Sequence, residues 1–162
     1  MENSRFYELA IERINAETKR LDDFCDALDK NPAERKSNIT EYKCAKYRYA
    51  GVTNVWCMFL FSHRTAERNA ENHYLNSQVN DIFVTRPEYV VLYDSAPEEE
   101  KRDYALYYGV IAFVEHKTAE ITAKLPFATD WEKIELEERM GGLQFARECL
   151  DEAWQKRKEA VE

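Results

Sequence analysis

The chain has 162 residues with a net charge of -8, and its apolar share of 44% is enough for one domain with a hydrophobic core. An acidic surface repels phosphates, so this charge disfavours direct binding to nucleic acid. Only four Gly and four Pro occur, too few for the many turns of an all-β sandwich. We therefore expect one all-α or nearly all-α domain over residues 1–162, built as a bundle of five or six helices.

The cysteines and the apolar runs indicate a cytoplasmic protein with no membrane contact. The four Cys form no CxxC pair, so the spacings of zinc fingers and redox sites are absent. The N-terminal residues lack a basic segment followed by an apolar run. The longest apolar run, residues 55–61, is far shorter than the roughly 20 residues that a membrane-spanning helix needs. The Cys are then expected to act as small apolar residues of the core.

The first helix is predicted over residues 4–30, because the residue before Pro32 is disfavoured in a helix. Its apolar positions recur three and four residues apart and form a heptad seam. Three heptads alone are short, so we expect the seam to pack within the chain, with a homo-oligomer through this helix as the alternative. The seam consists of Ile11, Ile14, Thr18, Leu21, Cys25 and Leu28.

Residues 33–50 fit either a helix or a strand, and they hold the one basic stretch of the chain, in which Lys and Arg are interleaved with Tyr. Such a stretch can hold single-stranded nucleic acid by charge and stacking. The overall acidity instead favours a solvated helix face with Tyr at its margin.

The middle of the chain gives two further predictions. Gly51 is expected to break the chain before a second long helix over residues 52–76, whose apolar positions form one stripe. Residues 82–93 are rich in β-branched and aromatic side chains, which predicts a short β-hairpin or a buried connection.

The second half of the chain predicts two more helices. Ser95 is expected to cap a helix that runs to Lys124 and is covered on two sides. The last helix begins at Asp130, and Gly141-Gly142 predicts a kink or a break in it. The tail, residues 155–162, is highly charged and is expected to fray.

A five-residue pattern occurs twice, as His63-Arg64-Thr65-Ala66-Glu67 and His116-Lys117-Thr118-Ala119-Glu120. His and Glu four positions apart on a helix can share an ion, and this spacing resembles one helix of a hemerythrin-like bundle. The resemblance covers those positions alone and implies iron, manganese or zinc. His116 is expected opposite the apolar stripe of its helix, so the better candidate for a metal site or a satisfied polar contact is the cluster of His63, Glu67, His73 and Glu115.

The same pattern contains His-x-Thr twice, at His63 and Thr65 and at His116 and Thr118, and it resembles the paired motifs of the 2H phosphoesterase family. The resemblance implies that the two His act as general base and general acid while the two Thr hold the phosphate. That family carries its motifs on β-strands, whereas both motifs here are predicted on helices. Coincidence among common helix-forming residues is the simpler interpretation.

The function predicted from the sequence is interaction with another protein. No nucleotide-binding loop, hydrolase elbow or HExxH motif occurs, so we expect a non-enzymatic protein without a cofactor. Ten Tyr and three Trp supply side chains that are favoured in interfaces. We expect an interaction or inhibitor protein with an acidic, Tyr-rich helical surface and a basic or nucleic-acid-binding partner. One such case is an inhibitor from a phage or mobile element that blocks a nucleic-acid-handling enzyme by charge mimicry.

Overall fold

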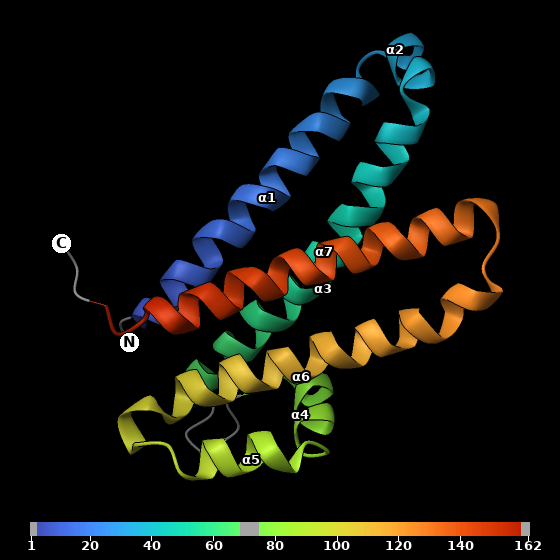
Figure 1. Cartoon of the computed structure of the whole chain (residues 1–162). Helices are drawn as coiled ribbons and strands as arrows, with labels where there is room; N and C mark the ends of the chain where they lie inside the picture. Colours follow the sequence, from blue (N-terminus) through green and yellow to red (C-terminus); the bar gives the residue numbers. More distant parts are fainter. Residues whose placement is uncertain (1–2, 69–74, 160–162) are drawn as a thin grey trace.

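The computed structural model describes residues 3–68 and 75–159, with the backbone alone for residues 65–68. These residues form seven α-helices and two short 3-10 helices and contain no strand, so the all-α prediction is confirmed and the expected number of five or six helices is too low (Figure 1). The elements are α1 (Arg5–Asp29), α2 (Pro32–Ser37), α3 (Ile39–Arg68), α4 (Ser77–Phe83), α5 (Pro87–Asp94), η1 (Glu98–Glu100), α6 (Lys101–Lys124), η2 (Leu125–Phe127) and α7 (Asp130–Lys156).

Four long helices set the architecture. α1 and α3 form a hairpin joined through α2, α7 packs against α3 and α1, and α6 lies beside α7 (Figure 1). The two short helices α4 and α5 lie on the side of α6 opposite α1 (Figure 1). Buried apolar side chains fill the space between these elements, among them Phe6, Ile14, Val52, Phe59, Leu106, Phe113, Leu143 and Leu150.

α1 begins and packs as the sequence predicts. The Ser4 side chain caps the helix by accepting a hydrogen bond from the backbone N–H of Tyr7 at 3.2 Å. The predicted seam packs inside the chain, so a homo-oligomer through the same side chains would first have to expose them. The seam residues that are buried in this way are Ile14, Leu21, Cys25 and Leu28.

α3 and α7 cross at two glycines that were expected to interrupt helices. Gly51 lies inside α3 and Gly142 inside α7, and both helices continue through them. A Cβ atom on Gly51 would lie 2.2 Å from the carbonyl oxygen of Arg139, and one on Gly142 would lie 2.3 Å from that of Arg48. The predicted breaks are therefore wrong. The glycines let two helix backbones touch, and this packing offsets the roughly 1 kcal/mol that each glycine costs inside a helix.

Residues 82–93 form the end of α4, a turn at residues 84–86 and most of α5, so the predicted β-hairpin is also wrong. The Asn76 side chain caps α4 by accepting a backbone N–H at 3.0 Å, and Pro87 occupies the first turn of α5. Tyr89 and Tyr93 of α5 pack against the core. β-Branched and aromatic residues favour strands only weakly, and here the packing of α5 against α6 decides the structure.

α6 is the central helix, as predicted, but Ser95 does not cap it. Ser95 instead ends α5, and its hydroxyl donates a hydrogen bond to the carbonyl oxygen of Val91. α6 begins at Lys101 and ends at Lys124. Its residues 109–114 are all buried, because α4 and α5 cover one side of the helix while α3 and α7 cover the other.

The basic stretch at residues 33–50 forms α2 and the first part of α3, and several of its charges are paired within the chain. Arg48 lies 3.4 Å from the Glu17 carboxylate, and Arg35 lies 3.0 Å from that of Asp29. These contacts agree with the expected solvated helix face.

The four cysteines are free thiols, and burial raises the pKa of each. Cys25 and Cys149 are buried in the core, while Cys44 and Cys57 are half-buried. This placement agrees with their expected role as small apolar residues. Across the described residues, we find no helix that combines the length and apolar character of a membrane span.

Candidate functional site

His63, which both sequence hypotheses use, lies near the end of α3 with only 4% of its surface exposed. Its ring stacks on Tyr7 of α1 with centroids 3.7 Å apart. Arg102 of α6 donates to Nδ1 at 2.9 Å, and Nε2 lies 3.1 Å from the amide oxygen of Asn3. The same Arg102 nitrogen also lies 3.3 Å from Nε2, so the guanidinium contacts both ring nitrogens. His63 thus joins three segments of the chain through polar contacts in a buried position.

A half-buried carboxyl lies next to Arg102 in sequence and holds the start of α1 against α6. The Ser4 hydroxyl donates to Asp103 at 2.7 Å while it also caps α1. Burial raises the pKa of Asp103, and the Ser4 hydrogen bond and the nearby charges of Arg102 and Arg157 oppose that rise. The beginning of α1 is therefore fixed by a carboxyl group that is itself costly to ionise.

Glu115 belongs to a different polar network, which joins α5, α6 and α7. The Tyr89 hydroxyl donates a hydrogen bond to Glu115. Arg147 lies 3.5 Å and Arg86 lies 3.8 Å from the same carboxylate. Burial and the contact with Glu115 raise the pKa of Tyr89 to about 12. Glu115 is thus neutralised by arginines from α7 and from the segment that precedes α5.

The predicted cluster of His63, Glu67, His73 and Glu115 is described only in part, because the Glu67 side chain and all of His73 lie outside the described residues. Arg102, the partner of His63, precedes Glu115 by 13 residues on α6, which is about 20 Å along the helix axis. The structure therefore does not bring His63 and Glu115 together. In the described part of the chain, no three His, Cys, Asp or Glu side chains are grouped to hold a metal ion.

The residues of the phosphoesterase hypothesis are also separated. His116 is exposed on α6 and lies 3.1 Å from the Glu120 carboxylate. Thr118 is half-buried, and its hydroxyl has no hydrogen-bond partner among the described residues. Both His-x-Thr motifs lie on helices, and Arg102, which contacts His63, precedes His116 on α6 by 14 residues, which is about 20 Å along the helix axis. The side chain of Thr65 lies outside the described residues.

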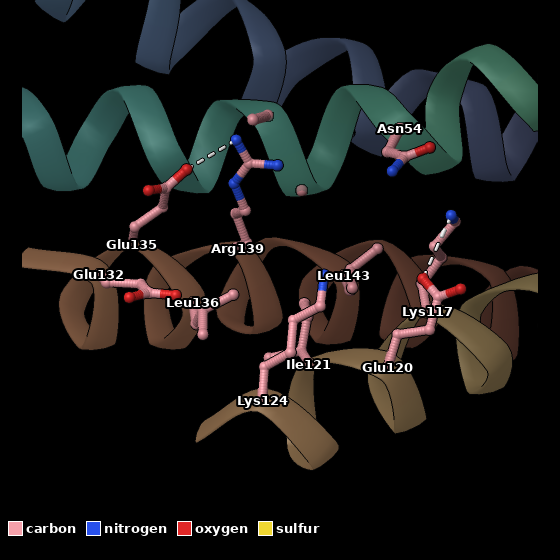
Figure 2. Close-up of a pocket in the computed structure, with 12 residues that line it drawn as sticks. Asn54, Lys117, Glu120, Ile121, Lys124, Glu132, Glu135, Leu136, Arg139 and Leu143 are labelled. Atoms are coloured by element: carbon pink, nitrogen blue, oxygen red, sulfur yellow. Dashed lines mark hydrogen bonds and ion pairs between the residues drawn. The ribbon is translucent and has the colours of Figure 1, made fainter. Parts of the chain in front are cut away.

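A cavity of about 380 Å³ opens between α3, α6 and α7, and its lining mixes charged and apolar side chains (Figure 2). Lys117 pairs with Glu120 at 3.3 Å, and Arg139 pairs with Glu135 at 2.9 Å. The lining consists of Ala50, Gly51 and Asn54 of α3, Lys117, Glu120, Ile121 and Lys124 of α6, and Glu132, Glu135, Leu136, Arg139 and Leu143 of α7.

The most exposed large apolar side chains in the described part of the chain do not include Tyr. Among the described Tyr residues, Tyr7 is buried and the others are half-buried at the edge of the core. The large apolar side chains that are exposed within the described residues are Phe24, Ile39, Phe61, Val84, Val91, Leu92, Phe127 and Trp131.

Three of these exposed side chains lie on the segment that forms α4, α5 and η1, which is also strongly acidic. Six acidic residues and one basic residue occur between positions 77 and 100. The one base, Arg86, is directed to Glu115 of α6. We call the exposed side chains of this segment the α4–α5 face; they are Val84, Val91 and Leu92 together with the acids Asp81, Glu88, Asp94, Glu98 and Glu99.

Comparison with known proteins found no match to a family model, a curated protein or a solved structure. The α4–α5 face was missed from the sequence because residues 82–93 were read as strands or as a buried connection. A helix that starts at Pro87 would have placed Glu88, Val91 and Leu92 on one side, since positions three and four apart are neighbours on a helix. Pro87 in a first helical turn was the available signal.

Proposed function

We propose that this chain is a non-enzymatic protein that binds a basic, amphipathic helix of another protein through the α4–α5 face. The proposal rests on one observation, the occurrence of three exposed aliphatic side chains and five exposed carboxylates within the short segment that forms α4, α5 and η1. Exposed apolar groups that lie together mark interaction surfaces, and the charge around them selects the partner.

The aliphatic side chains of the α4–α5 face are exposed, and α5, which carries two of them, packs against α6. The exposed fractions are 61% for Val91, 59% for Val84 and 42% for Leu92. On its inner side, α5 is held to α6 by the hydrogen bond from Tyr89 to Glu115 and by the contact of the Tyr89 and Tyr108 rings, whose centroids are 5.3 Å apart. A helix that is already held in place by packing loses little conformational entropy when a partner binds to it.

The acidic part of the face is available to a partner. Among the ion pairs of the described residues, Glu98 has a partner in Lys101 at 4.0 Å, whereas Asp81, Glu88, Asp94 and Glu99 have none. Their charges can therefore attract cationic side chains and speed association with a basic protein. A helix with an apolar stripe bordered by Lys or Arg complements both the aliphatic centre and the acidic rim.

A basic partner of this kind is also the one expected for the inhibitor predicted from the sequence. A protein that handles nucleic acid presents basic residues to the phosphates. An acidic face that occupies such residues competes with nucleic acid for them, so binding and inhibition would be the same event.

A second exposed apolar site at the turn between α6 and α7 serves as a control. Phe127 is 85% exposed and Trp131 is 40% exposed. Two exposed lysines, Lys124 and Lys133, lie close to them in the sequence. This turn is therefore not uniformly acidic, unlike the α4–α5 face. The turn therefore offers exposed apolar area without a uniform acidic rim.

The proposal is tested by the fluorescence anisotropy of a labelled helical peptide made of Leu and Lys in amphipathic spacing. We expect saturable binding to the protein that weakens as salt is added, because the attraction is partly electrostatic. Val91→Ser with Leu92→Ser, or Glu88→Gln with Asp94→Asn, should weaken binding at least about tenfold.

Two controls decide the outcome. Phe127→Ser with Glu137→Gln removes an exposed apolar group and an acidic charge elsewhere and should leave the affinity unchanged. A peptide of the same composition with its Leu residues scattered should bind much more weakly. Equal binding of the scattered peptide, or equal loss in the control variant, would show that the attraction is non-specific and would refute the proposal.

A further inference from the structure

The cavity between α3, α6 and α7 lies apart from the α4–α5 face and has its own chemistry (Figure 2). Its volume of about 380 Å³ falls near the lower end of the range that is typical of small-molecule sites. The space therefore suits a ligand of amino-acid size better than a nucleotide or a large cofactor.

Among the charged side chains that line the cavity, one cation and one carboxylate have no ion-pair partner within the described residues and can bind a ligand. Lys117 and Arg139 each have a carboxylate partner within the cavity wall. Lys124 of α6 and Glu132 of α7 enter no ion pair among those of the described residues. The lining carries three cations and three carboxylates, so a ligand with several negative charges would meet as much repulsion as attraction.

The apolar lining lies between these charges. Ile121 of α6 and Leu136 and Leu143 of α7 belong to the same wall, and Figure 2 shows the Lys124 side chain extending from α6 towards Leu143. Six of the twelve lining residues are charged, so the cavity is more polar than most small-molecule sites, and these three side chains form its apolar part.

We infer that this cavity binds a zwitterionic α-amino acid with an apolar side chain. Lys124 binds the ligand carboxylate, Glu132 binds the ligand ammonium group, and the apolar side chain packs on Ile121, Leu136 and Leu143. A zwitterion fits because one free charge of each sign faces the cavity from two different helices.

Isothermal titration of the intact protein with three related compounds tests this inference. L-Phenylalanine should bind saturably, whereas phenethylamine lacks the carboxylate and 3-phenylpropionate lacks the ammonium group, so each should bind at least about tenfold more weakly. L-Leucine and L-methionine are titrated in parallel to cover aliphatic side chains.

Matched variants locate the binding. Lys124→Gln and Glu132→Gln should each weaken amino-acid binding at least about tenfold, whereas Lys133→Gln and Glu137→Gln, which change exposed charges of α7 outside the lining, should not. The inference is overturned if none of the three amino acids binds, if the amine or the acid binds as tightly as phenylalanine, or if the control variants lose binding equally. Peptide binding at the α4–α5 face is measured separately and does not depend on this result.

Discussion

The Asp103 carboxyl lies between the start of α1 and α6, where Ser4 donates a hydrogen bond to it. Burial is the main cause of its raised pKa. A carboxyl whose pKa is higher in the folded than in the unfolded chain favours folding when it is protonated. That contribution is complete below its ordinary pKa of about 4 and is lost as the pH rises through the folded-state pKa. At neutral pH the ionised Asp103 therefore lowers the stability of the fold.

Asp103→Asn should raise the free energy of unfolding at pH 7, because the amide keeps an acceptor for Ser4 without a buried charge. The advantage over the unchanged chain should shrink to near zero at pH 3.5. Urea denaturation of both chains at the two pH values measures this difference. Asp94→Asn, which alters an exposed carboxyl, is the control and should have little effect at either pH. A loss of stability in Asp103→Asn at pH 7 would contradict this account of Asp103.

The contacts of single residues were the least predictable part of the protein. The sequence indicated that His63 would lie inward and in polar surroundings, and the structure buries it. Its contacts include Tyr7, Asn3 and Arg102, which lie 39 to 60 positions away in the chain. Helical periodicity gives the face of a residue but not its partner on another helix. That is why Glu115 was expected near His63 and was found with Tyr89 and Arg147 instead.

At the scale of helices, the crossing of α3 and α7 depends on Gly51 and Gly142. At each position an added Cβ would meet the backbone of the other helix, which cannot move aside as a side chain can. Gly141 differs, because an added Cβ there would meet only the end of the flexible Arg48 side chain, at 3.3 Å. Gly142 therefore permits the close contact between the helices, whereas Gly141 is not needed for it.

Gly142→Ala should lower the free energy of unfolding by about 1–3 kcal/mol or more, as expected when a tightly packed contact is overfilled. Gly141→Ala should leave stability unchanged or raise it by up to about 1 kcal/mol, because alanine is the better helix former. Urea denaturation of the two variants compares neighbouring positions with the same chemical change. Equal effects of the two substitutions would show that the helices do not depend on close contact at Gly142.

The long helices α1, α6 and α7 could largely be predicted from the sequence, whereas the start of α3, the short helices and the roles of glycine could not. The ends of α1 and the end of α6 were predicted because Ser and Pro act locally, and the start of α7 was predicted at Asp130, although the Thr129 side chain makes no capping hydrogen bond. Gly51 and Gly142 were read as breaks because the sequence gives the cost of glycine in a helix but not the packing that offsets it. Residues 82–93 were misjudged for a similar reason, since their packing against α6 outweighs a weak local preference for strand.

At the scale of the whole molecule, the segment that forms α4, α5 and η1 has the largest excess of acidic over basic residues, ahead of α7 and α1. The segment from residue 77 to residue 100 has five more acidic than basic residues, in a chain whose net charge is -8. This segment lies on the side of α6 opposite α1 (Figure 1). The acidic composition could be read from the sequence, but its concentration around exposed aliphatic side chains required α4 and α5 to be recognised as helices.

The binding surface can be mapped directly by titrating the unlabelled amphipathic peptide into ¹⁵N-labelled protein and recording amide chemical shifts. We expect saturable shift changes that are largest within residues 77–100 and small along α1 and at the turn between α6 and α7. The largest changes at any other surface, or small changes spread over all acidic residues, would contradict the assignment of the α4–α5 face as the binding surface.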